Sequence, residues 1–147
     1  MKYKWLFVIG ILLLCVGCGL DKKEKIFLTC DVSLDSEITS LKEENVSITF
    51  YGVEDKYPSR STRLITGVID GEVEDINPIV ESLKSNYCNS EIKDNYSCEA
   101  LPNNDSIIIK EDGYPYQILG IEKNLAIDEY QKLLKEKGFT CKKESKK

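Results

Sequence analysis

The side chains of this 147-residue chain that could do acid–base chemistry are carboxylates, because the sequence contains no histidine. The commonest general base and the usual Ser-His or Cys-His nucleophile pairs are therefore excluded. Three acidic residues, Glu72, Glu74 and Asp75, lie close together along the chain. They could bind calcium, or serve a small carboxylate-dependent cell-wall hydrolase as acid and base. The D-x-[DN]-x-[DN]-G loop of a calcium site is missing, and a solvated acidic turn is the simpler interpretation.

Cysteine is the other residue type that could be chemically active, through disulfide formation or metal binding. Four cysteines, at positions 30, 88, 98 and 141, follow the apolar N-terminal run. An even number in an exported domain indicates two disulfides, and four cysteines allow three pairings. We favour the local pair Cys88–Cys98 together with the long-range pair Cys30–Cys141. Metal binding is the alternative, but these four cysteines have no C-x-x-C spacing, so we expect no metal site and no cofactor.

The remaining two cysteines, Cys15 and Cys18, end a short apolar run that follows a basic N-terminus. This layout is typical of a secretory signal, and the run is short for a membrane-spanning helix, which needs about 20 residues. Its end resembles a bacterial lipobox, in which a small residue precedes the cysteine that receives a diacylglyceryl group. Gly17 precedes Cys18, whereas bulky Leu14 precedes the other cysteine. We therefore expect residues 1–17 to be a lipoprotein signal peptide; an uncleaved anchor helix and a plain signal peptide are the alternatives.

Two acyl chains on Cys18 would hold the protein stably in a membrane. Residues 18–25 would then form the lipidated start and a polar tether, which reaches at most about 25 Å at roughly 3.5 Å per residue. We expect a protein on the extracytoplasmic face of the cell membrane, with residues 26–141 as one domain. Residues 142–147 are expected to form a flexible basic tail, solvated or touching anionic headgroups.

Residues 31–122 carry a large excess of acidic side chains, and the whole chain has a formal net charge of −5. An acidic body repels nucleic acid, so no nucleic-acid partner is expected. The basic patch from Ser59 to Arg63 is expected on an exposed strand edge, where charge discourages aggregation. Tyr57, Tyr114 and Tyr116 lie beside prolines; they could bind peptide or glycan, but we prefer packing over the edge of the core.

Alternation of apolar and polar residues predicts a first strand over residues 26–34, with Cys30 facing inward. Further strands are predicted over residues 46–50, 61–69, 96–100, 106–110 and 114–121. Loops and turns are expected over residues 35–45, 52–60 and 102–105. Helical spacing predicts one helix that starts with Asn77 as its capping side chain and ends near Cys88, and a second that starts near Ile127 and stops at Gly138. These elements predict the α+β class, an antiparallel β-sheet with two α-helices packed on one face.

The order of these features is familiar. Thr29-Cys30 lies on the first strand, two β-rich segments, a helix and more strands follow, and a last helix closes in Gly138-Phe139-Thr140-Cys141. This layout resembles small lipoproteins of Gram-positive bacteria of the YehR-like type. The resemblance implies an α+β domain with a cysteine pair between the first strand and the last helix, and it supplies no catalytic residues. The pair Cys88–Cys98 lies outside it and depends on spacing alone.

The anchor, the short tether and the lack of catalytic groups lead to one functional expectation. We expect a non-enzymatic, membrane-anchored surface lipoprotein that binds an extracellular or cell-envelope partner, which could be a protein, a peptide or a cell-wall ligand. The acidic body favours a cationic peptide, because opposite charges steer association. The alternative is the carboxylate-dependent cell-wall hydrolase, with Glu72, Glu74 or Asp75 as its candidate residues.

Overall fold

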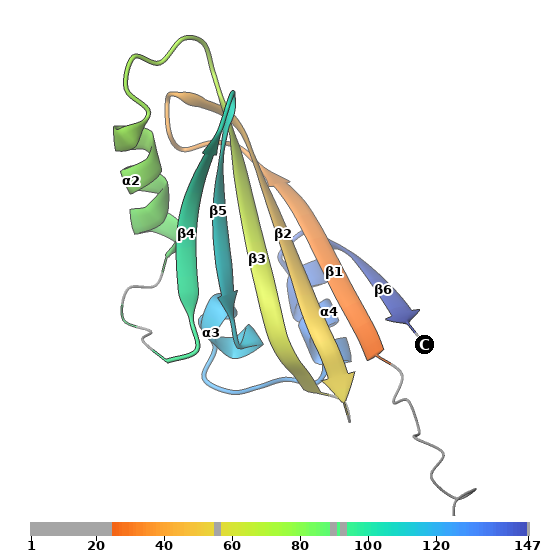
Figure 1. Ribbon diagram of the computed structural model, residues 1–147. Helices are drawn as coiled ribbons and strands as arrows, with labels where there is room; N and C mark the ends of the chain where they lie inside the picture. Colours follow the sequence, from red (N-terminus) through yellow and green to blue (C-terminus); the bar gives the residue numbers. More distant parts are fainter. Residues whose placement is uncertain (1–24, 55–56, 89–90, 92–93, 147) are drawn as a thin grey trace, which may run out of the picture.

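The computed structural model describes residues 25–54, 57–88, 91 and 94–146, which form one antiparallel sheet with three helices (Figure 1). Its elements in chain order are β1 Lys25–Leu34, β2 Leu41–Glu54, β3 Tyr57–Ile69, α2 Asn77–Tyr87, β4 Ser97–Asn103, β5 Ser106–Gly113, α3 Pro115–Leu119, α4 Ile127–Glu136 and β6 Thr140–Lys146. The strand order is β4-β5-β3-β2-β1-β6, and each neighbouring pair is antiparallel. The predicted α+β class with an antiparallel sheet is confirmed, with three helices described where two were predicted.

One face of the sheet is apolar because successive side chains of a strand point to opposite faces. In β2, Val46, Ile48 and Phe50 are buried, while the residues between them are partly exposed. Burial in β5 alternates in the same way at every residue. Cys30 points into the core, as predicted, and is fully buried. The period of two in the sequence therefore identifies the inner face of the central strands correctly.

The helices α2 and α4 contribute side chains to the core cluster that contains the buried sheet residues. Their buried residues are Ile79, Leu83, Ile127, Tyr130 and Leu134. The ring of Tyr130 stacks on that of Phe50, with ring centroids 5.0 Å apart. The helix α4 is followed by Gly138, which has a φ of 92°, and the Phe139 N–H donates to the Leu134 carbonyl at 3.0 Å. Glycine favours this kind of helix end, so the predicted stop is confirmed.

The strand predicted over residues 114–121 is wrong, because the chain leaves the sheet after β5 and forms the short helix α3. Pro115 lies in the first turn of this helix, where its missing N–H is not needed. The Gln117 Oε1 atom accepts a hydrogen bond from the Tyr114 N–H at 2.9 Å. Gly120 ends the helix with a φ of 63°. A short run of apolar residues cannot by itself distinguish a strand from a helix.

The flexible tail predicted for residues 142–147 is wrong for residues 142–146, which form most of β6. Their backbone pairs with the first half of β1. Just before them, Cys30 and Cys141 are opposite one another in the two strands and are joined by a disulfide, which fixes this register. Lysine and glutamate are depleted in strands, so the sequence gives little sign of this one. Residue 147 lies outside the described residues.

The hairpin of β2 and β3 is longer than the sequence predicts. The strand β2 begins at Leu41, inside the loop predicted over residues 35–45, and ends at Glu54. The strand β3 begins at Tyr57, so both strands enter the turn predicted over residues 52–60. Asn45 and Ser47 in β2 are only partly buried and lie on the other face from the core, which polar side chains tolerate.

Candidate functional site

A hollow of about 700 Å³ lies at one end of the sheet, between the β3–α2 loop and the β4–β5 turn. These two segments are at the upper end of the molecule in Figure 1, away from the start of β1. The hollow combines three carboxylates with three apolar side chains, namely Glu72, Glu74 and Asp105 with Ile69, Val73 and Ile76. It is therefore a recess that could take a cation together with an apolar stem.

Backbone conformation and one hydrogen bond shape this hollow. The Ile69 N–H donates to the Asp105 carbonyl at 2.8 Å, which joins the end of β3 to the β4–β5 turn. Gly71 has a φ of 82°, a conformation that favours glycine, and it turns the chain out of the sheet. Asn104 has a φ of 45° in the β4–β5 turn, where asparagine is well tolerated. Glu72 and Asp105 therefore come together although they are far apart in the sequence.

The three predicted site residues do not all belong to the hollow. Glu72 and Glu74 line it, but Asp75 does not. The Asp75 Oδ1 atom accepts hydrogen bonds from the Asn77 N–H at 3.0 Å and from the Asn77 Nδ2 at 2.8 Å. Asp75 therefore satisfies N–H groups at the start of α2, the role that the sequence analysis gave to Asn77 itself, and the helix cap is Ile76.

Across the described part of the chain, no group of three or more His, Cys, Asp or Glu side chains is placed to hold a metal ion. Sequence analysis identified Glu72 and Glu74 but missed Asp105. No sequence signal links Asp105 to them, because the contact depends on how β3 and the β4–β5 turn align.

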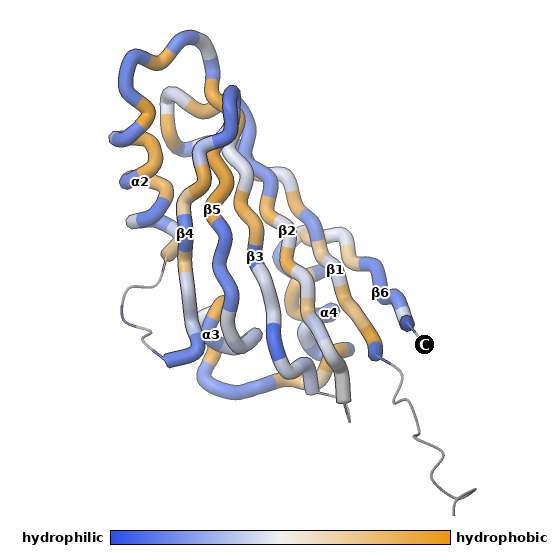
Figure 2. The backbone as a smooth tube through the Cα atoms, in the orientation of Figure 1, coloured by the Kyte–Doolittle hydropathy of each residue, from blue (hydrophilic) through white to orange (hydrophobic). Residues whose placement is uncertain are grey.

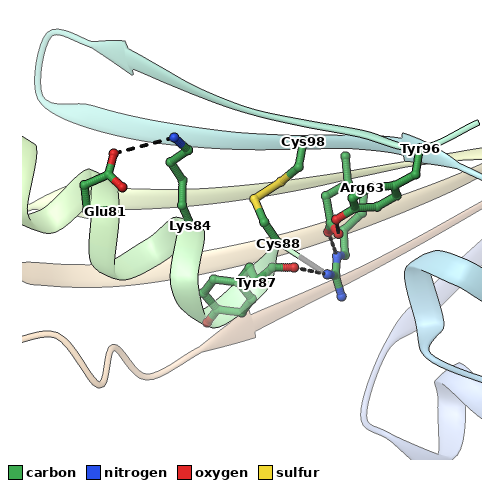
Figure 3. Close-up of a disulfide and its surroundings, with 8 residues drawn as sticks. Arg63, Glu81, Lys84, Tyr87, Cys88, Tyr96 and Cys98 are labelled. Carbon is green, nitrogen blue, oxygen red and sulfur yellow. Dashed lines mark hydrogen bonds and ion pairs between the residues drawn. A yellow bond between two sulfur atoms is a disulfide. The ribbon is translucent and has the colours of Figure 1, made fainter. Parts of the chain in front are cut away.

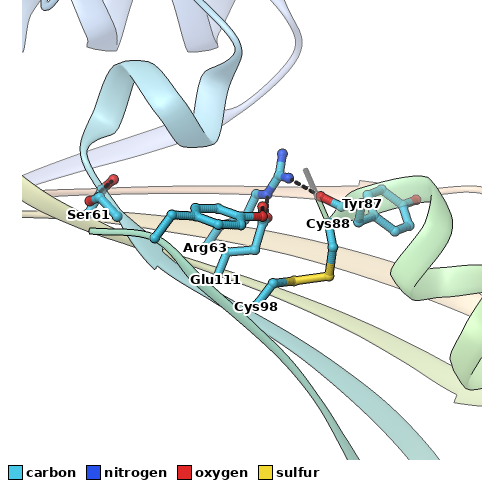
Figure 4. Close-up of polar contacts among 8 residues, drawn as sticks. Ser61, Arg63, Tyr87, Cys88, Cys98 and Glu111 are labelled. Carbon is cyan, nitrogen blue, oxygen red and sulfur yellow. Dashed lines mark hydrogen bonds and ion pairs between the residues drawn. A yellow bond between two sulfur atoms is a disulfide. The ribbon is translucent and has the colours of Figure 1, made fainter. Parts of the chain in front are cut away.

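A second polar cluster lies on the inner face of the sheet, beside a disulfide (Figures 3 and 4). Its centre is Glu111 of β5, whose side chain is only 1% exposed. The Arg63 Nε atom of β3 donates to one Glu111 oxygen, and the Tyr96 hydroxyl donates to the other at 2.5 Å. The Arg63 Nη2 atom donates to the Tyr87 carbonyl at 2.8 Å, at the end of α2. The arginine thus neutralises a buried carboxylate and ties the sheet to a helix end.

The prediction that the Ser59–Arg63 patch lies on an exposed strand edge is wrong for Arg63. The strand β3 lies between β2 and β5, and the Arg63 side chain is 18% exposed. Arg63 lies two residues from Ser61 and two from Ile65 in β3, so the three side chains point to the same face of the sheet. Ser61 and Ile65 are both fully buried. This parity with Ile65 is the signal that could have placed the side chain on the inner face.

Both predicted disulfides are present in the structure. Cys30 bonds to Cys141, and Cys88 bonds to Cys98. The second bond joins the end of α2 to β4, with 5.9 Å between the two Cα atoms, and the Arg63–Glu111 pair lies beside it (Figure 4). Cys141 belongs to β6, so the long-range bond joins two neighbouring strands and not a strand and a helix.

The hydroxyl of Tyr87 donates a hydrogen bond to Glu44, a buried carboxylate that is 2% exposed. Burial and the Glu44 charge raise the pKa of Tyr87 well above its ordinary value. The protonated form is therefore favoured in the fold, so its contribution to stability is complete below about pH 10 and is lost as the pH rises above that value. We expect the free energy of unfolding to fall more steeply above pH 10 in the native protein than in Tyr87→Phe.

Urea unfolding at a series of alkaline pH values measures this difference. Tyr57→Phe, a change at an exposed tyrosine, is the matched control and should keep the native slope. Parallel curves for the native protein and Tyr87→Phe would contradict the assignment of this tyrosine as the partner of Glu44.

Two of the tyrosines beside prolines are more exposed than packing over the edge of the core predicts. Tyr57 is 51% exposed and Tyr114 is 39% exposed. The ring of Tyr114 stacks on that of Tyr116, with ring centroids 5.7 Å apart. Tyr57 therefore presents about half of its surface to solvent at the end of the sheet opposite the hollow.

Comparison with known proteins finds no match among family models, curated proteins or solved structures. The resemblance to YehR-like lipoproteins therefore stays a prediction. Cys18 and the expected signal peptide lie outside the described residues. Within the residues that the structure describes, no helix is both long and apolar enough to cross a membrane.

Proposed function

We propose that this protein is a lipoprotein, anchored through Cys18 on the extracytoplasmic face of the cell membrane, that binds a cationic peptide without catalysis. The observation that carries the proposal is the hollow, which Glu72, Glu74 and Asp105 line together with apolar side chains. An ammonium or guanidinium group on an alkyl stem would meet carboxylates with its charge and apolar residues with its stem. The acidic body around the hollow would steer such a partner toward it.

The two disulfides support the export of this protein. Disulfides persist in oxidising compartments and are rare in the cytosol. The short spacer from Cys18 to β1 would hold the domain near the membrane, and the hollow lies at the far end of the sheet (Figure 1). A ligand would then approach from the side away from the lipid.

The packing of the helices against the sheet supports binding at the hollow. We infer that α2 and α4 cover the same face of the sheet, because their buried residues belong to one core cluster with those of the strands. The helix α2 is packed there through Ile79 and Leu83, so the loop before it is anchored on one side. A hollow with an anchored wall loses less conformational freedom when it binds than a free loop would.

Titration of the intact protein with a lysine-rich peptide tests the proposal. We expect binding at low salt that weakens strongly toward physiological salt, because screening acts on exposed charges. The triple change Glu72→Gln, Glu74→Gln and Asp105→Asn should lower the affinity at low salt by about tenfold or more. Isothermal titration calorimetry or fluorescence anisotropy of a labelled peptide gives both values.

A matched triple variant separates the hollow from overall charge. Asp94→Asn, Glu122→Gln and Glu136→Gln remove the same charge at exposed positions outside the hollow. This control should lower the affinity much less than the hollow variant. No binding at low salt would refute cationic-peptide binding, and equal losses in the two variants would show that the hollow is not the site.

A further inference from the structure

The end of the sheet opposite the hollow has a different chemical character. The strand β1 starts there and β6 ends there, with Lys25 paired to Lys146. We call the exposed and half-buried side chains at this end the basal surface, which consists of Lys25, Phe27, Tyr51, Tyr57, Arg60 and Lys146. In Figure 2 this end joins a hydrophilic β6 to an apolar start of β1. The basal surface thus combines three cations with three aromatic rings.

Direct contacts hold part of the basal surface together. The Lys146 ammonium lies 5.5 Å from the centre of the Phe27 ring. The Phe27 ring meets that of Tyr51 edge to face, with ring centroids 6.0 Å apart. Tyr51 is in turn paired with Arg60 across the β2–β3 ladder. Side chains from β1, β2 and β6 are therefore in direct contact, and Arg60 of β3 lies opposite one of them.

The charges of the basal surface are available to an external partner. The ion pairs near this end of the described chain use Lys142 with Glu144 and Lys143 with Asp128. Among the described residues, no ion pair engages Lys25, Arg60 or Lys146. The basal surface thus carries three cations, and the carboxylates whose charges interact with Lys146 and Arg60 are those of Glu144 and Asp112. The chain as a whole carries a net charge of −5.

We propose that the basal surface rests on the anionic phospholipid surface of the membrane that holds the anchor. Lysine and arginine beside a bilayer are attracted by anionic headgroups, and tyrosine is enriched at the level of the headgroups. The proposal builds on the anchor proposed above, since Cys18 lies only seven residues before Lys25 and a spacer of this length spans at most about 25 Å. Docking would turn the hollow outward, toward its ligand.

A fluorescent probe at the basal surface tests this orientation. The one tryptophan of the chain, Trp5, lies in the expected signal peptide, so the lipidated protein is a background without intrinsic tryptophan. In this background, Tyr57→Trp introduces a probe at the basal surface, and Leu101→Trp introduces a matched probe on β4, toward the other end of the sheet. Both positions carry large exposed side chains, 51% and 45% exposed. The full lipidated protein is reconstituted in vesicles that contain brominated lipids, which quench tryptophan.

We expect the probe at position 57 to be strongly quenched, and blue-shifted, in vesicles of phosphatidylcholine with about one-third phosphatidylglycerol. Quenching should be weaker in pure phosphatidylcholine. The probe at position 101 should be little quenched in either. Lys25→Gln with Lys146→Gln should lower the equilibrium constant between the docked and undocked states by about fivefold for each lysine. The matched control, Lys135→Gln with Lys137→Gln at the end of α4, should leave the quenching unchanged.

The outcomes separate this inference from the proposed function. Equal quenching at positions 57 and 101 would overturn it. Quenching at position 57 that is the same with and without phosphatidylglycerol, or that is unchanged by Lys25→Gln with Lys146→Gln, would also overturn it. In these cases, a mass of the reconstituted protein that shows an acyl-modified Cys18 would still support the proposed anchor. An unmodified Cys18 would overturn both proposals, while peptide binding to the hollow is measured independently.

Discussion

Replacing Arg63 by alanine should lower the free energy of unfolding by about 3–5 kcal/mol. Glu111 would then be left with a charge in the core and no cation beside it, because its side chain is 1% exposed. The same change removes the donor to the Tyr87 carbonyl, so the end of α2 loses a contact with the sheet. Urea unfolding near neutral pH, with both disulfides oxidised, measures the loss.

A neighbouring ion pair provides the matched control. Lys110 and Asp112 pair with 3.0 Å between Nζ and Oδ2, and their side chains are 42% and 18% exposed. Lys110→Ala should cost much less than Arg63→Ala, as exposed ion pairs contribute little. The double change Arg63→Met with Glu111→Leu should recover most of the loss, because it removes both charges from the core. If Arg63→Ala costs no more than Lys110→Ala, the account of a buried, compensated carboxylate is wrong.

The sequence predicts the parts of this fold that depend on local periodicity. The first strand and the inward direction of Cys30 follow from strict alternation between residues 26 and 34. The helix before Gly138 follows from apolar residues at helical spacing and a glycine stop. In both segments the local pattern and the tertiary packing favour the same structure, so local reasoning is sufficient.

Features that depend on strand register could not be predicted in this way. Arg63 and Glu111 are opposite one another in the β3–β5 ladder, and this pairing alone brings their charges together. The sequence predicts Arg63 on an exposed strand edge and makes no prediction for Glu111. Register in a sheet is set by the whole hydrophobic pattern and the turns, and not by the residues that happen to meet.

The candidate site shows the same limit. Glu72 and Glu74 are close in sequence, so a cluster of carboxylates was visible from the start. Asp105 joins them only because the Ile69 N–H bonds to its carbonyl across the sheet end. Asp75 leaves the cluster because its side chain accepts hydrogen bonds from Asn77 at the start of α2. The composition of the hollow is therefore a tertiary property.

Removing the long-range disulfide should also have a large effect. Cys30→Ala with Cys141→Ala should lower the free energy of unfolding by about 4–5 kcal/mol, because the bond closes a loop with a sequence separation of 111. The strand β6 has only exposed or partly buried side chains and one neighbouring strand, so little else holds it against β1. We expect its backbone amides to exchange rapidly with solvent in this variant, while those of β3 and β5 stay protected.

The local disulfide is the matched control for this prediction. It closes a loop with a sequence separation of 10, so Cys88→Ala with Cys98→Ala should cost only about 3 kcal/mol. Hydrogen exchange should then rise near the end of α2 and in β4, and β6 should stay protected. Loss of β6 would also free Lys146 from its place opposite Lys25, so the long-range variant should weaken membrane docking while the local variant does not. Protection of β6 that survives the loss of the Cys30–Cys141 bond would contradict this reasoning, because it would mean that backbone pairing alone holds the strand.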